Sequence, residues 1–201
     1  MSKLENPLSE QEEVKNKKWA ETSQEVEVIG DKLGKKIDEN IKETVVALKV
    51  LDFETSASCE GHLDHGIASP WVDIRFENKK LLDRFRSLNK TIDEEESRDP
   101  ESAGLGNLYD QLGGLEKEKD QVVLVPLKRL ADLFSIFYNN RTVEFGTRLI
   151  MDMWPWGCRI QCQGAELQDV ASPEEREENL RKYQAEMNAF VSFLKESFFR
   201  S

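Results

Sequence analysis

The spacing of hydrophobic residues changes along this chain, and that change constrains the fold more than any other feature. Between residues 33 and 48 the apolar positions recur every three or four residues, the period of one face of an α-helix. These positions are Leu33, Ile37, Ile41, Val45 and Leu48. Between residues 71 and 76 they alternate instead, at Val72, Ile74 and Phe76, as on the buried face of a β-strand. The fold must therefore combine helices with strands.

The first third of the chain contains two further predicted elements, a helix before residue 33 and a strand after residue 51. Ser9 and Glu12 form a capping box, which predicts a charged helix up to about Gly30. Its apolar positions are sparse, so we expect residues 1–30 to form a loosely attached helical arm. The helix that starts at Leu33 should end near Leu51. Residues 54–59 are small and rich in Ser and Thr, which favours a short strand leading into a turn.

The rest of the chain mixes both periods. Residues 81–92 predict a helix, whereas residues 97–119 are polar and glycine-rich, which indicates a long loop with scope for mobility. A short β-type run at 121–125 precedes Pro126, which suits the first position of another helix. Residues 147–153 and 158–163 predict a β-hairpin. Ser172 and Pro173 begin a long terminal helix, whose expected buried positions are Leu180, Tyr183, Met187, Phe190, Leu194 and Phe198.

These elements predict an α+β fold with a small, mainly antiparallel sheet, flanking amphipathic helices and a long C-terminal helix. The chain has 201 residues, of which 38% are hydrophobic, enough for one core, so we expect a single domain over 1–201.

Composition limits which partners the protein can bind and indicates the cellular compartment in which it works. The net charge of −11 argues against duplex nucleic acid and anionic membranes as partners, because phosphate binding needs a basic surface. No apolar run approaches the roughly 20 residues that span a bilayer, and the first residues lack an apolar signal core. The chain has three cysteines, which is a small and odd number, so a disulfide scaffold is not expected. We expect a cytoplasmic protein.

One segment carries chemically suggestive residues. Residues 55–66 contain hydroxyls, a thiol, carboxylates, two glycines and both histidines of the chain. A metal site is one interpretation, because Cys59, His62, Asp64 and His65 are all zinc-type ligands. Cys158 and Cys162 cannot complete it as a pair, since four residues of strand would separate them by roughly 13 Å.

Three other interpretations compete. In the first, Cys59 is a catalytic nucleophile with His62 or His65 as its base. In the second, backbone N–H groups of the Ser/Gly turn bind an anion or nucleotide without a standard phosphate-loop motif. In the third, Ser58 and His62 only satisfy local backbone groups of an ordinary turn.

Two local patterns add a resemblance. The turn Ser58-Cys59-Glu60-Gly61-His62, followed by Pro70-Trp71-Val72-Asp73-Ile74, resembles that of small bacterial and phage proteins. More distantly, the segment is similar to the wybutosine-synthesis methyltransferase family of tRNA modification. Four residues match the sequence pattern of that family, namely Thr55, Ser58, Cys59 and Gly61. That resemblance implies methyl transfer from S-adenosylmethionine to a tRNA base, and a pocket lined by Ser58, Cys59, Gly61 and His62.

Three hypotheses of function follow. The leading one is a polar pocket that binds a small or nucleotide-like ligand. In it Cys59 and His62 are the catalytic candidates, and the ligand-binding candidates are Thr55, Ser58, Gly61 and Asp73. The second is a non-enzymatic interaction or structural protein that forms a homodimer through the helix at residues 173–199. The third is a metal-dependent hydrolase that uses His62, Asp64, His65 and Asp73. Zinc and S-adenosylmethionine are the candidate cofactors.

Overall fold

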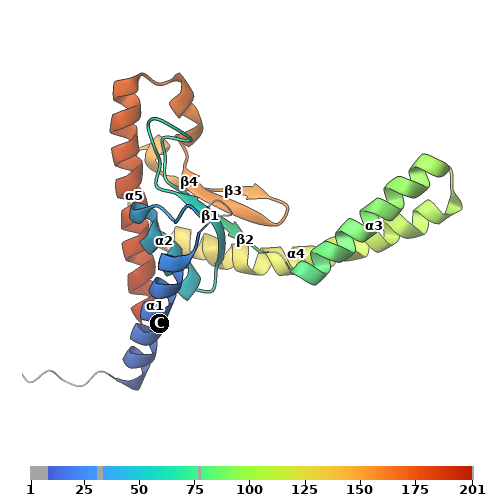
Figure 1. Ribbon diagram of the computed structural model, residues 1–201, viewed down its shortest axis with the longest axis horizontal. Coiled ribbons are helices and arrows are strands. Elements are labelled where there is room, and N and C mark those ends of the chain that lie inside the picture. Colours follow the sequence, from blue (N-terminus) through green and yellow to red (C-terminus); the bar gives the residue numbers. More distant parts are fainter. Residues whose placement is uncertain (1–8, 31–33, 77, 201) are drawn as a thin grey trace, which may run out of the picture. The chain divides into compact units, whose positions relative to one another are not determined.

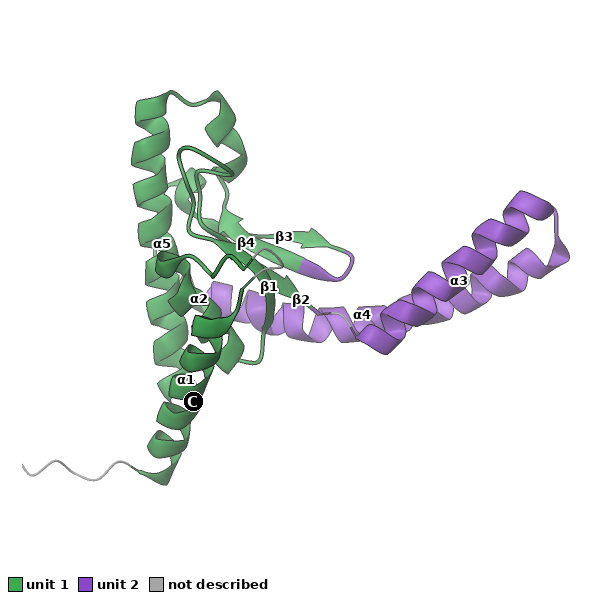
Figure 2. Ribbon diagram, viewed as in Figure 1, with its two compact units in different colours: residues 1–75, 136–154, 158–201 green, residues 76–135, 155–157 purple. Residues whose placement is uncertain are grey.

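The protein folds into an α+β structure, seen in a computed structural model that describes residues 9–30, 34–76 and 78–200. The chain divides into two compact units (Figure 2). Unit 1 comprises residues 1–75, 136–154 and 158–201, and unit 2 comprises 76–135 and 155–157. Hydrophobic periodicity predicts that a helix has a buried face but not which core that face joins, so it could not reveal this division.

Unit 1 is built on a four-stranded antiparallel sheet in the order β1-β2-β4-β3 (Figure 1). Its strands are β1 (Glu54–Cys59), β2 (Trp71–Arg75), β3 (Leu149–Trp154) and β4 (Gly157–Cys162). The short strand at 54–59, the alternating strand and the hairpin are thus confirmed. Val72, Ile74 and Phe76 are buried as predicted, because alternation places them on the face opposite Trp71.

Three helices pack in unit 1: α1 (Glu10–Val28), α2 (Glu39–Val50) and α5 (Pro173–Arg200). Both hydrogen bonds of the Ser9–Glu12 capping box are present at the start of α1. This helix is less loosely attached than predicted, since Val26 is buried and Trp19 packs on Phe198 and Phe199. The predicted helix start at Leu33 lies outside the described residues, and α2 itself begins only at Glu39.

The apolar face of α5 is buried within the protein. All six positions predicted from its spacing have exposed fractions below a tenth, namely Leu180, Tyr183, Met187, Phe190, Leu194 and Phe198. Phe190 also meets the ring of Phe137 at 5.1 Å between centroids. This face therefore stabilises the fold of one chain.

The structure of unit 2 differs from the predictions for residues 97–126. It contains α3 (Lys79–Arg98) and most of α4 (Ala103–Phe137), so the predicted loop at 97–119 is helical except at residues 99–102, and the β-type run at 121–125 is helical. Pro126 lies inside α4 rather than at its start. The two helices share a small core, formed by Leu81, Phe85 and Leu115 with Leu88, Leu112, Val122 and Trp156 against it. This burial outweighs the low helix propensity of the glycines in α4.

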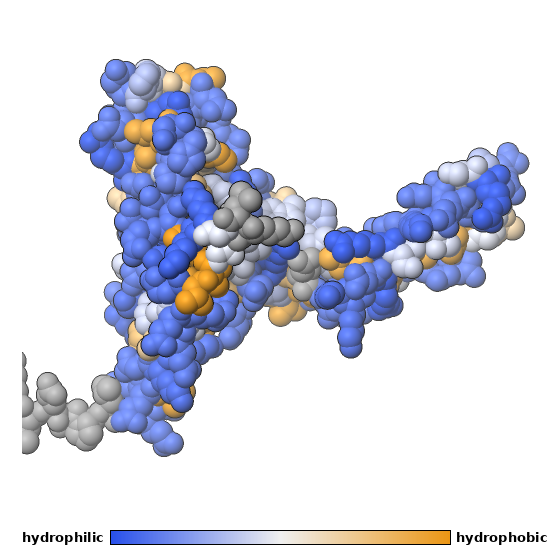
Figure 3. Space-filling model, in the orientation of Figure 1, coloured by the Kyte–Doolittle hydropathy of each residue, from blue (hydrophilic) through white to orange (hydrophobic). Residues whose placement is uncertain are grey.

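The surface agrees with the high charge content of the sequence. Figure 3 shows a mostly hydrophilic face on which apolar residues form only small patches. Among the described residues, no helix is both long enough and apolar enough to cross a bilayer.

Candidate functional site

A pocket of about 390 Å³ lies in unit 1 beside the end of β1. The segment before α2, strand β1 and the turn after it form most of the wall. Its lining includes hydroxyl, imidazole, thiol and carboxylate groups together with apolar side chains. The lining residues are Ile29, Gly30, Lys35, Lys36, Ile37, Asp38, Val45, Thr55, Ser56, Ala57, Ser58, Cys59, His62, His65 and Trp71.

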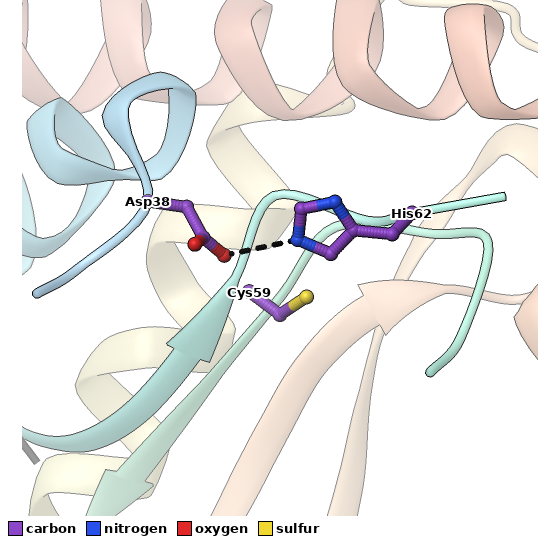
Figure 4. Close-up of side chains that lie close together, drawn as sticks. All are labelled: Asp38, Cys59 and His62. Carbon is purple, nitrogen blue, oxygen red and sulfur yellow. Dashed lines mark hydrogen bonds and ion pairs between the residues drawn. The ribbon is translucent and has the colours of Figure 1, made fainter. Parts of the chain in front are cut away.

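Three of these side chains converge (Figure 4). The Nε2 atom of His62 lies 3.3 Å from Oδ2 of Asp38. The Sγ atom of Cys59 lies beside them, and the three ligand atoms are all within 4.8 Å of one another. Asp38 and His62 are only 15% and 20% exposed at the side chain, so the cluster is largely screened from solvent.

A reciprocal contact between two segments positions this cluster. Asp38 occupies the N-cap position of α2, but its side chain does not cap the helix. It accepts a hydrogen bond from the backbone N–H of Glu60 at 3.4 Å. In return, the carboxylate of Glu60 accepts the N–H of Asn40 in the first turn of α2 at 2.9 Å. The turn after β1 thus caps α2, which leaves Asp38 to face His62.

Gly61 lets the turn approach the rest of unit 1 closely. Its φ is +86°, and a Cβ atom there would lie 2.7 Å from both Leu180 Cδ1 and the carbonyl carbon of Ser69. Only glycine fits such a position. Gly61 does not line the pocket, contrary to its predicted ligand-binding role, but its N–H donates to Sγ of Cys59 at 3.4 Å.

Two pKa values in the cluster move in opposite directions. Burial acts to raise the pKa of Asp38, but the Glu60 N–H, His62 and Lys35 outweigh it, so this pKa falls below its usual value. Burial raises the pKa of the Cys59 thiol, and the negative charges of Asp38 and Glu60 add to the rise against the Gly61 N–H and Lys35. A catalytic thiolate requires the opposite shift. The cluster therefore gives no support to Cys59 as an activated nucleophile.

The structure also brings together the three metal ligands predicted from sequence. Ligand atoms of His62, Asp64 and His65 lie within 4.8 Å of one another. Nδ1 of His65 is 2.8 Å from Oδ1 of Asp64. The ring of His65 stacks on the ring of His62, with 4.2 Å between the ring centroids. Asp64 and His65 are both exposed, with side chains 84% and 57% accessible. His62 therefore belongs to two alternative clusters, a partly buried one with Asp38 and Cys59 and a more exposed one with Asp64 and His65.

Of the residues predicted to bind a ligand, Thr55 and Ser58 line the pocket, whereas Asp73 does not. The Asp73 carboxylate is held by Arg159, at 2.7 Å and 3.1 Å. Arg159 in turn lies over the ring of Trp71 at 3.9 Å. The sequence could not reveal this, because the partner comes from β4, 86 positions away. Asp73 thus joins β2 to β4 through this ion pair.

Sequence reasoning missed Asp38 as a site residue. The helix predicted from Leu33 placed Asp38 inside a helix, whereas Asp38 is the N-cap residue of α2 and contacts a turn more than twenty residues later. Comparison with protein-family models, with curated proteins and with solved structures found no significant match to this chain. The resemblance to the wybutosine-synthesis family therefore stays a prediction.

Proposed function

We propose that this protein binds a small molecule in the pocket beside β1. The observation that carries the proposal is the convergence of Asp38, Cys59 and His62 in the wall of a cavity of about 390 Å³. Cavities of roughly 300–1,000 Å³ with a few convergent polar groups in an otherwise apolar lining are typical of small-molecule sites.

The lining favours a ligand with one polar and one apolar part. Ile29, Ile37 and Val45 offer apolar surface, and Trp71 adds an aromatic ring. The hydroxyls of β1 and the ammonium groups of two lysines offer donors for a phosphate or carboxylate. These groups are Thr55, Ser56, Ser58, Lys35 and Lys36. Nucleotides and S-adenosylmethionine both combine a planar base with such a polar group, so they are the first compounds to test.

A thermal-shift screen with nucleotides and S-adenosylmethionine tests the proposal. A compound at one hundred times its dissociation constant should add about 2.7 kcal/mol to the free energy of unfolding. Ala57→Trp fills the pocket from an exposed strand position and should abolish the shift. Ala185→Trp adds the same side chain at an exposed position of α5 that does not line the pocket, and should leave the shift unchanged. Equal shifts in both variants would place the ligand elsewhere.

A further inference from the structure

We propose that Asp38, Cys59 and His62 bind a divalent transition-metal ion of the zinc class. The inference deepens the proposed function and rests on it, because all three residues line the ligand pocket and the ion would lie in its wall. Sequence reasoning named Cys59 and His62, together with Asp64 and His65, as possible zinc ligands, but it did not name Asp38. The proposal therefore assigns the metal to the partly buried cluster that includes Asp38.

The geometry of the three ligand atoms is close to that of a bound metal. Zinc lies about 2.0–2.3 Å from nitrogen, oxygen and sulfur ligands in tetrahedral sites, so two such ligands are about 3.3–3.8 Å apart. Oδ2 of Asp38 and Nε2 of His62 are already 3.3 Å apart. Sγ of Cys59 is within 4.8 Å of both, so small side-chain rotations would complete the set.

Neighbouring groups hold these ligands in place. Consecutive backbone N–H groups of the turn donate to two of them, Glu60 to Asp38 and Gly61 to Cys59, both at 3.4 Å. The ring of His65 stacks on the third ligand, His62. Such supporting contacts orient metal ligands and are a regular part of metal sites.

The donor set determines the kind of metal. One sulfur, one nitrogen and one oxygen suit zinc or cobalt, whereas magnesium and calcium prefer oxygen alone. Three protein ligands leave one tetrahedral position, which can take water or a pocket ligand, as in zinc sites that act on substrates. The alternative cluster lacks the sulfur, and two of its members are solvated.

Cobalt titration of the full chain, under reducing conditions, tests the proposal. The wild type should develop the near-ultraviolet thiolate-to-cobalt absorption band, and zinc should remove it. Cys59→Ser, with Cys59→Ala as a second variant, should abolish the band, and Asp38→Asn should weaken cobalt binding by at least ~10–100-fold. Asp64→Asn removes a ligand of the exposed cluster only and is the matched control, so it should keep the band. Circular dichroism of each variant establishes that it is folded.

Two results would overturn the proposal: a wild type without the band, or a band that is lost in Asp64→Asn but kept when Cys59 is replaced. The thermal-shift screen, repeated in a chelator, separates this failure from that of the proposed function. If a compound raises the unfolding temperature but no cobalt band appears, only the metal-site proposal is refuted. A cobalt band with no shift by any compound leaves the metal site standing and removes the support for ligand binding.

Discussion

The side chains of Asp38 and His62 lie 24 positions apart in the sequence and meet at 3.3 Å. Their contact joins the start of α2 to the turn after β1. It depends on an exchange of capping roles, because Glu60 caps α2 and leaves the carboxylate of Asp38 directed at His62. Unit 1 thus places a polar cluster where a helix start and a strand end meet, and each of the following predictions tests one part of that arrangement or of its support.

Gly61→Ala should destabilise the protein by about 2–4 kcal/mol. The positive φ costs about 1–2 kcal/mol for any other residue, and the clash with the backbone at Ser69 adds a packing cost of about 1–2 kcal/mol. Gly66→Ala is the control, since Gly66 has a φ of +67° but no atom within 4 Å of the added methyl group. Urea unfolding of both variants measures the difference. Equal losses of stability in the two variants would contradict the close contact of Gly61 with Ser69 and Leu180.

Asp73→Asn should cost about 1–3 kcal/mol, because it leaves the partly buried Arg159 guanidinium without its charged partner. Asp132→Asn removes an exposed ion pair with Lys128 and should cost less than about 0.5 kcal/mol. Chemical denaturation compares the two. Since Asp73 lies outside the pocket, Asp73→Asn should also keep the ligand-induced thermal shifts. A loss of those shifts in folded protein would indicate that Asp73 contributes to ligand binding.

Gly106→Ala and Gly114→Ala should each stabilise the protein by about 0.5–1 kcal/mol. Both glycines lie within α4, where alanine has the higher helix propensity, and no atom lies within 4 Å of either added methyl group. Far-ultraviolet circular dichroism during thermal unfolding measures the gain. If residues 97–119 formed the loop predicted from their composition, neither substitution would raise stability in this way.

Trp19→Ala should lower the free energy of unfolding by about 2–3 kcal/mol. The indole packs on Phe198 and Phe199, with ring centroids 6.1 Å and 5.6 Å away, and Lys195 lies over it at 4.8 Å. Val14→Ala, at a position of α1 that is 63% exposed, should change stability by less than about 0.5 kcal/mol. Equilibrium denaturation decides whether α1 belongs to the core or is the loose arm that its composition suggested.

Stability should fall as the pH rises above about 9, in part because of Cys158. Burial raises the pKa of this thiol from 9.0 to about 12, and the carboxylates of Asp73 and Asp152 add to the rise. Between these values the unfolded thiol loses its proton while the folded one keeps it, so unfolding becomes more favourable. The contribution reaches at most about 1.4 kcal/mol per pH unit. Cys158→Ala should show a shallower decline of unfolding free energy with pH, and an unchanged slope would contradict this assignment.

The local pattern of the sequence predicted those elements whose signal is itself local. The spacing of apolar residues identified β2 and the buried face of α5, and the capping box identified the start of α1. Composition likewise indicated the segment that supplies Thr55, Ser58 and the histidines to the pocket. In each case the period or the cap depends on neighbours within a few residues.

Only the tertiary structure decided which side chains meet. The pairs Asp38–His62 and Asp73–Arg159 join elements far apart in the sequence, and no local pattern encodes such contacts. The glycines of α4 predicted a loop because their intrinsic preference disfavours helices. Packing against Leu81 and Phe85 reversed that preference, since burial of apolar side chains outweighs a propensity difference of about 1 kcal/mol per glycine.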